Sequence, residues 1–390
     1  MARIARLLCA AILMVLAGVV VVTTLAGSMF TSEPQLVADL TGYTPARVAL
    51  IQKDLAGSPD VSRGDVTRRV RQLLGRAPLS ASALAFEGLS ALRAGDGALA
   101  DKAFAASYRR DPRNEAARIW IAQRAIDGGD MALAIKLLDG LIAIGPERSQ
   151  LYLEAMAQLA SLPGGAVAVG TRLESQPWWA GQVVSRLNKT LLDLDLLLEL
   201  NRRTLATQGE YMARVLKEAG PEIAFRYWLR LVPEAEAARF TWPYDGELRN
   251  KPAPTPFNWT LHSDLAEFMP GGGLDLTYLG RGRLALLEQT LLLGPGRYRL
   301  VAKLSGDARD NGGGFGWSVA CVSDASELGR VIARPLTSKS KSYTFEFVVP
   351  ATDCPDQRLL LGGEPGEFPI RAHAELQSVA IIPLAEMARQ

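Results

Sequence analysis

The chain has 390 residues, of which 48% are hydrophobic and 22% are charged. This composition is close to the globular average and excludes general disorder, a collagen-like fibre and a protein with many membrane spans. At ~150 residues per domain, the length predicts two or three folded units. The net charge of +2 lacks the basic excess of a dedicated nucleic-acid binder, so we expect no nucleic-acid partner. The two histidines, His262 and His373, and the three cysteines are too few and too scattered for a zinc cage or a Ser-His-Asp set.

The N-terminal segment is the most apolar part of the chain. Residues 7–32 follow Arg3 and Arg6 and carry no charge, a run longer than the ~20 residues that a helix needs to cross a bilayer. We therefore interpret residues 1–32 as a cytoplasmic stub and a transmembrane anchor. The positive-inside rule then predicts a single-pass protein of the inner (cytoplasmic) membrane, with the bulk of the chain periplasmic or otherwise extracytoplasmic. A cleavable signal peptide is the alternative, because Ala26-Gly27-Ser28 offers the small residues that a signal peptidase accepts.

A 34-residue period follows the N-terminal segment. Pro78, Pro112 and Pro146 are 34 residues apart. Gly95-Asp96 recurs at the same spacing as residues 129–130, and apolar stripes at helical spacing flank each Gly-Asp pair. The pattern predicts helix hairpins over residues 76–238, preceded by a linker and capping helices over residues 33–75. The residues expected to be buried between paired helices are Ala100, Phe104, Ala134 and Leu138.

A helix pair of this length, with a small-large-small pattern in its second helix, resembles the tetratricopeptide repeat. The resemblance implies an α-helical solenoid without catalytic chemistry, which presents a concave surface to a protein partner. The family's basic and Asn clamp for a peptide carboxylate is absent from the positions expected on that surface, which are Ser82, Ala85, Leu89, Leu92, Ala116, Ile119, Gln123 and Ile126. Such an apolar groove either takes a partner helix or hydrophobic peptide, or packs against helices of residues 176–232.

The chain changes character near residue 238. Residues 251–256, KPAPTP, cannot form a helix, and the following segments alternate with period two between Gly and Pro residues. Residues 239–390 are therefore predicted to form an all-β sandwich. The expected strands are residues 257–262, 274–279, 284–293, 297–304, 315–323, 329–333, 342–349, 358–362 and 373–382.

Several phrases of this part resemble the jelly-roll carbohydrate-binding modules. They are Asp245-Gly246-Glu247-Leu248 at the opening, Phe257-Asn258-Trp259, the hairpin from Gln289 to Tyr298 with its Pro-Gly-x-Tyr, and the closing segment from Glu375 to Ile381. The resemblance implies a jelly-roll sandwich that binds a glycan. The acidic and apolar residues Glu247 and Leu248 depart from the opening motif, which leaves its usual ligand or calcium role open.

Sugar binding needs exposed aromatic rings, because the C–H faces of a pyranose pack on a π surface while polar side chains take its hydroxyls. The candidate glycan contacts are Trp242, Tyr244, Trp259 and Asp245. Trp317 shares a strand face with Cys321 and is expected in the core. The loop with Asp307, Asp310 and Asn311 is either a calcium site or a plain turn, so the metal stays undetermined, and we expect no cofactor.

Cys321 and Cys354 lie 33 residues apart in the part predicted to be extracytoplasmic. A pair in an oxidising compartment predicts a disulfide, and the alternative is two buried thiols.

The leading hypothesis is a membrane-anchored scaffold of a cell envelope. Its helical repeats would hold a protein partner and its sandwich would bind or guide a polysaccharide during surface-polysaccharide assembly or export. The alternative is a protein-protein adaptor with a structural sandwich, and the third is a glycan-active enzyme. No carboxylate pair stands in a recognisable glycosidase constellation, so we expect no enzyme.

Overall fold

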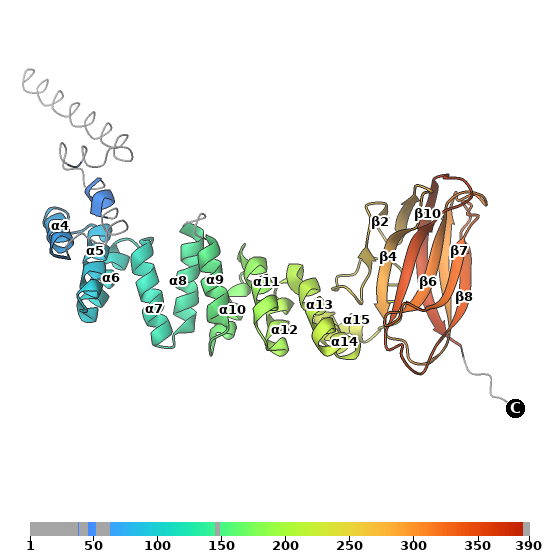
Figure 1. The fold of residues 1–390 in the computed structure, drawn as a ribbon, viewed down its shortest axis with the longest axis horizontal. Helices are drawn as coiled ribbons and strands as arrows, with labels where there is room; N and C mark the ends of the chain where they lie inside the picture. The colour runs from blue at the N-terminus through green and yellow to red at the C-terminus, as the bar shows by residue number, and fades with distance from the viewer. Residues whose placement is uncertain (1–37, 39–45, 52–62, 145–148, 385–390) are drawn as a thin grey trace, which may run out of the picture. The chain divides into compact units, whose positions relative to one another are not determined.

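The computed structural model describes residues 38, 46–51, 63–144 and 149–384 (Figure 1). The chain divides into two compact units, Met1–Arg172 and Leu173–Gln390. The first unit is helical, and the second contains further helices followed by two antiparallel sheets.

The structure does not support the predicted membrane anchor. Among the helices in the described ranges, none combines the length and the apolar character that crossing a membrane requires. Residues 7–32, on which the prediction depended, lie outside the described residues. The fold class is therefore a helical region followed by a two-sheet unit, and the predicted single-pass inner-membrane localisation is not supported.

The helices of the first unit repeat with the predicted period. The first helices of successive pairs begin at Ala81, Glu115 and Ser149, and the second helices begin at Gly97, Met131 and Gly165, in each case 34 residues apart. The third pair, which follows Pro146, keeps this register. The helices are α4 (Arg63–Arg76), α5 (Ala81–Arg93), α6 (Gly97–Arg110), α7 (Glu115–Asp127), α8 (Met131–Ile144), α9 (Ser149–Ala160) and α10 (Gly165–Leu173).

Local chemistry explains the repeated hairpin. Gly95 and Gly129 both adopt φ +79°, a left-handed conformation that a glycine takes without a steric penalty. The following residue caps the next helix, since the Asp96 carboxylate accepts a hydrogen bond from Leu99 N at 3.0 Å and Asp130 accepts one from Leu133 N at 3.0 Å. The same short sequence thus ends one helix and begins the next.

The predicted interior of the helix pairs is confirmed. Ala100, Phe104, Ala134 and Leu138 are all buried. The Phe104 ring lies over Gly88, where an added Cβ would approach it to 2.7 Å, so only a glycine leaves room for the ring.

The helices of the second unit are α11 (Ala180–Thr190), α12 (Leu194–Arg202), η2 (Leu205–Thr207), α13 (Gln208–Ala219), α14 (Pro221–Leu231) and α15 (Glu234–Ala237). A buried polar network joins α11, α12, η2 and the start of α13. The Asn188 and Asn201 side chains hydrogen-bond each other, and Thr207 Oγ1 donates to Asn201 Oδ1 at 2.8 Å. Each buried amide is therefore satisfied, as the low dielectric of an interior requires.

The predicted β-sandwich is confirmed. One sheet has the strand order β1-β4-β9-β6-β7 and the other β2-β3-β10-β5-β8 (Figure 1). The strands are β1 (Thr260–Leu261), β2 (Ala266–Phe268), β3 (Leu274–Tyr278), β4 (Leu284–Leu291), β5 (Gly296–Gly306), β6 (Gly314–Cys321), β7 (Glu327–Ala333), β8 (Lys341–Val349), β9 (Gln357–Glu364) and β10 (Ala372–Pro383). The expected strands did not include β2, which has only three residues.

Both sheets contribute to one apolar core. Phe315 and Trp317 on β6 are fully buried, as are Leu300 on β5 and Leu376 on β10. Trp317 therefore has the core position that the strand pattern predicted.

Candidate functional site

The residues predicted to contact a glycan lie at the junction of α14 and the sandwich. Six rings from both parts pack there with centroid separations of 4.6–6.2 Å, and we call them the junction cluster: Phe225, Trp228, Phe240, Trp242, Tyr244 and Phe257. Trp228 Nε1 also donates to Pro254 O at 2.7 Å, which ties α14 to the chain leading into the sandwich. The cluster makes this helix and the sandwich parts of one packed body.

The three predicted glycan-contact rings are buried to different degrees. Tyr244 and Trp259 are 3% and 6% exposed, and Trp242 is half-buried between Phe225 and Phe240. The burial of Tyr244 and Trp259 leaves no ring face open to a sugar, whereas Trp242 keeps part of its surface exposed. The described ring contacts of all three are packing contacts, and a glycan contact by Trp242 stays a prediction.

Asp245 organises a loop. Its carboxylate accepts hydrogen bonds from Arg249 N at 3.0 Å and Lys251 N at 3.1 Å. Its carbonyl oxygen accepts one from Trp259 Nε1 at 3.0 Å. The side chain is buried and its oxygens are occupied by backbone donors, so its described contacts are structural.

An exposed ring lies elsewhere on the sandwich. Phe368, in the loop between β9 and β10, is 54% exposed, and no other ring of the described sandwich is exposed to a comparable degree. Phe368 N donates to Asn311 O at 3.1 Å, and Ile370 N donates to Phe368 O at 2.8 Å. Arg334 donates to Gly312 O at 2.9 Å and to Pro365 O at 3.3 Å, so the loop that carries the ring is fixed to its neighbour.

A second loop completes this end of the sandwich. Leu279, at the end of β3, is also 54% exposed. At Gly280 an added Cβ would lie 2.5 Å from Ile370 O, so the two loops are in direct backbone contact. Exposed apolar surface from two loops therefore gathers at the end of the sandwich where β3 and β9 finish and β4 begins.

Charged side chains lie on the adjoining sheet. Glu364, the last residue of β9, pairs with Arg330 of β7 and with Arg283 Nε at 3.3 Å, and its side chain is only 12% exposed. Gly316 of β6 makes room for it, because an added Cβ would lie 2.6 Å from Glu364 Cγ. Arg330 also reaches Glu327 at 3.5 Å. We call the set Phe368, Leu279, Arg283, Arg330 and Glu364 the loop-end site.

The loop-end site offers the two kinds of contact that sugars need. A phenyl ring and a leucine can pack on C–H faces, while guanidinium and carboxylate groups can hydrogen-bond to hydroxyls. Sequence reasoning missed Phe368, although its phrase Pro365-Gly366-Glu367-Phe368-Pro369 carried a signal. A ring between prolines and a glycine cannot belong to a regular strand and is therefore expected in an exposed loop.

The candidate calcium loop makes structural contacts. Asp307 Oδ1 accepts a hydrogen bond from His373 N at 2.7 Å. Within the described part of the chain, no three or more His, Cys, Asp or Glu side chains are grouped so that they could hold a metal ion.

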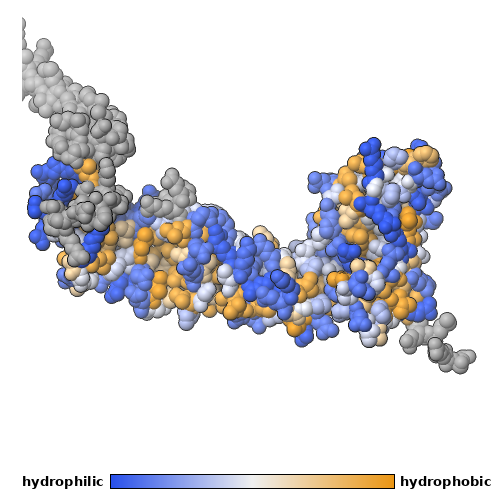
Figure 2. Space-filling view, in the orientation of Figure 1, coloured by the Kyte–Doolittle hydropathy of each residue, from blue (hydrophilic) through white to orange (hydrophobic). Residues whose placement is uncertain are grey.

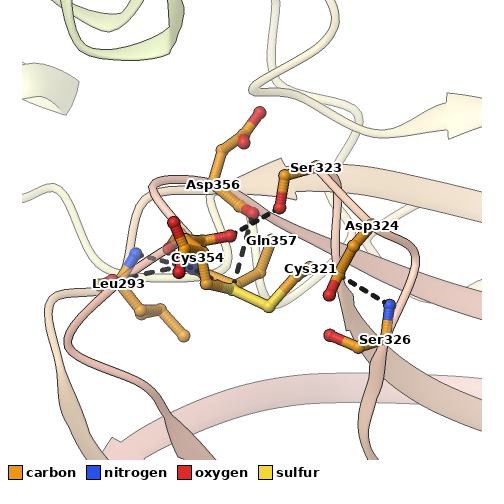
Figure 3. Close-up of a disulfide and its surroundings, with 9 residues drawn as sticks. Leu293, Cys321, Ser323, Asp324, Ser326, Cys354, Asp356 and Gln357 are labelled. Carbon is orange, nitrogen blue, oxygen red and sulfur yellow. Dashed lines mark hydrogen bonds between the residues drawn. A yellow bond between two sulfur atoms is a disulfide. The ribbon is translucent and has the colours of Figure 1, made fainter.

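The predicted disulfide between Cys321 and Cys354 is confirmed, with a Cα–Cα distance of 5.3 Å (Figure 3). It joins the end of β6 to the loop before β9. Gln357 Nε2 donates to Cys354 O at 2.9 Å, and Ser323 Oγ donates to Asp353 O at 2.5 Å, so the bridge and two hydrogen bonds hold this loop.

The first unit has an apolar groove between α7 and α9. It has a volume of about 530 Å³, and three of the positions predicted for the concave surface, Ile119, Gln123 and Ile126, line it. Ile119 is 45% exposed and Leu151, on the facing helix, is 65% exposed. Apolar residues gather over this part of the helical region (Figure 2). Of the other predicted positions, Ala85 is buried, and Ser82, Leu89, Leu92 and Ala116 are half-buried.

Comparison with known proteins gives structural neighbours only. No family model matches the chain, and no curated protein matches it. Among solved structures, TmCBM61 in complex with β-1,4-galactotriose is 9% identical, with a TM-score of 0.25, over 33% of this chain and 88% of that chain. Family 16 Carbohydrate Binding Module-2 is 16% identical, with a TM-score of 0.25, over 32% of this chain and 89% of that chain. A CBM4 structure is 13% identical, with a TM-score of 0.23, over 30% of this chain and 78% of that chain.

These matches cover about a third of the chain, and at such identities and TM-scores they carry no argument about a ligand. The resemblance of the helical region to the tetratricopeptide repeat likewise stays a prediction.

Proposed function

We propose that this chain is a non-enzymatic scaffold whose sandwich binds a glycan at the loop-end site and whose helical groove holds a protein partner. The observation that carries the glycan part is Phe368, a ring 54% exposed on a loop that hydrogen bonds hold in place. An exposed ring can pack on the C–H face of a pyranose, and a fixed loop lowers the entropy lost on binding. A protein with these two ligands fits a scaffold in polysaccharide assembly or export.

The charged part of the site favours binding over bond cleavage. A glycosidase needs one carboxyl group that gives up a proton to the leaving oxygen and a second carboxylate across the bond. The Glu364 carboxylate is instead paired with Arg283 and Arg330, which makes it a fixed hydrogen-bond acceptor. We therefore propose hydroxyl recognition as its role.

The proposed protein partner rests on the groove between α7 and α9. Its two walls carry apolar residues at helical spacing, with Ile119 and Ile126 on α7 and Leu151 and Leu159 on α9. Parallel ridges of this kind accept the apolar face of a partner helix.

The test is binding of the full chain to a printed array of neutral and charged oligosaccharides. For a glycan that binds, Phe368→Ala should weaken binding at least tenfold, because it removes the only sugar-stacking ring of the site. The matched control is Trp178→Ala, which truncates a ring 64% exposed in the helical part and should leave the affinity unchanged.

Three results would overturn the proposal. Absence of any array binding would favour the adaptor alternative, in which the sandwich is structural. Equal binding by the Phe368→Ala variant would remove the loop-end site. Release of new reducing ends from a bound glycan would show an enzyme.

A further inference from the structure

A pocket of about 540 Å³ lies between α14 and the loops at the disulfide end of the sandwich. We call it the junction pocket. Its volume is in the ~300–1,000 Å³ range of sites for small molecules. Helix α14 and two loops form it, and its lining residues include Glu222, Phe225, Pro295, Pro350, Asp353 and Pro355.

The apolar wall is fixed before any ligand arrives. The Phe225 ring packs against Trp228, Phe240 and Phe257 with centroid separations of 5.2–5.7 Å, so its position is set by the junction cluster. The proline rings have no freedom of rotation about φ. A ligand that enters this pocket meets a preformed surface.

The polar wall consists of carboxylates. Glu222 and Asp353 line the pocket, and no Lys or Arg is among the residues that line it. The loop of Asp353 is held by the disulfide of the next residue and by the hydrogen bond from Ser323 Oγ to Asp353 O. Glu222 stands in the first turn of α14, directly after Pro221.

Two carboxylates without a lining counter-charge, beside an aromatic ring and proline rings, complement a cation with an apolar body. The ammonium group can pair with the carboxylates, while C–H groups of the same ligand pack on the prolines and on the part of Phe225 that lines the pocket. We propose that the junction pocket binds an amino sugar with a free amine. A sugar is favoured over a basic peptide because the pocket has the size of a small-molecule site and its walls are rigid apolar rings, three prolines and Phe225, on which a pyranose can pack.

The junction pocket shares no residue with the loop-end site. The two can therefore fail separately, although both concern glycans.

The experiment measures binding of the full chain to β-1,4-linked glucosamine tetramer by calorimetry, with the fully N-acetylated tetramer as the matched ligand. The free-amine tetramer should bind at least tenfold more tightly, and its affinity should fall as salt is raised because the attraction is between charges. Glu222→Gln together with Asp353→Asn should weaken binding at least tenfold. Asn is chosen because Asp353 adopts φ +64°, a conformation that Asn tolerates.

The control variant is Asp264→Asn together with Glu267→Gln, which removes two exposed carboxylates outside the pocket and should not change the affinity. Phe368→Ala should also leave it unchanged. If the double variant melts at a lower temperature than the wild type, the single variant Glu222→Gln replaces it as the test. Glu222 is an exposed helix residue and can be replaced without loss of packing. The single variant should weaken binding of the glucosamine tetramer at least threefold.

Equal affinity for the two tetramers, or unchanged affinity in the pocket variants, would overturn the proposal. Tighter binding of a tetralysine peptide than of the glucosamine tetramer would overturn the assignment to a glycan.

Discussion

The side-chain amide of Gln289 hydrogen-bonds both the backbone N–H and the backbone C=O of Tyr244. Gln289 Oε1 accepts a hydrogen bond from Tyr244 N at 2.8 Å, and Gln289 Nε2 donates one to Tyr244 O at 3.0 Å. Gln289 is fully buried. One amide of β4 thus satisfies both backbone polar groups of Tyr244, a buried residue in the segment that enters the sandwich.

Gln289→Leu should lower the free energy of unfolding of the second unit by about 2–4 kcal/mol, because two buried backbone groups lose their partners while the side-chain volume stays similar. Urea denaturation of the full chain measures it. The control is Gln377→Leu, a half-buried position where the structure records one hydrogen bond, from Ser340 Oγ at 2.8 Å. A loss below ~1 kcal/mol for Gln289→Leu would contradict the importance of this pairing.

Phe104→Ala should destabilise the helical unit by ~3–5 kcal/mol, because the ring is 1% exposed and its removal leaves a cavity over Gly88. Thermal unfolding followed by far-ultraviolet circular dichroism measures the loss. Leu99→Ala on the same helix removes a side chain that is 41% exposed and should cost well under half as much. Equal effects of the two substitutions would show that the helix pairs pack differently.

Tyr244→Phe should stabilise the protein slightly at neutral pH, by up to about 1 kcal/mol, because the buried hydroxyl has no hydrogen-bond partner within the described residues. Tyr298→Phe is the control, since its hydroxyl donates to Gly294 O at 2.9 Å and its loss should not stabilise. Calorimetric melting of both variants distinguishes them, and a lower melting temperature for Tyr244→Phe would contradict the prediction.

The same hydroxyl makes stability depend on alkaline pH. Burial, followed by the charges of Glu236 and Asp245, raises the pKa of Tyr244 to about 12, above the value of ~10 in an unfolded chain. The folded state thus favours the neutral phenol, and this contribution is complete below pH ~10 and is lost as pH rises toward about 12. Stability measured between pH 10 and 12 should fall less steeply in Tyr244→Phe than in the wild type. An identical decrease of stability with pH in the two proteins would contradict the attribution of this pH dependence to the Tyr244 hydroxyl. Burial also raises the pKa of Tyr278 and Tyr343, so part of the alkaline loss should persist.

Reduction of the disulfide should lower the free energy of unfolding of the second unit by ~3–4 kcal/mol in the chain-entropy model, since the bond closes a loop of 33 residues. The transition of the helical unit should stay unchanged. Differential scanning calorimetry with and without reductant distinguishes the transition of the second unit from that of the helical unit. Both thiols found free by mass spectrometry of the non-reduced protein would contradict the bond.

Local patterns determined much of the fold. The 34-residue spacing of Pro and Gly-Asp set the helix register, because a left-handed glycine followed by a capping aspartate acts within a few residues of chain. Alternation with period two set the strands and placed Trp317 inside, because side chains on a strand alternate between its two faces. The disulfide could also be predicted from the sequence, because two cysteines in a predicted sandwich needed only that β6 lie close to the loop before β9.

Tertiary structure decided which rings face water. Trp242, Tyr244 and Trp259 lie in or beside an aromatic, Pro-rich segment that looked like a surface loop. Rings of α14 pack on Trp242 and Tyr244, and Trp317 of β6 packs on Trp259. Phe368 is exposed because its loop is held to Asn311 and Gly280 by backbone contacts from distant strands. Exposure depends on what packs over a side chain from elsewhere in the chain, and a local pattern of residues carries no record of that cover.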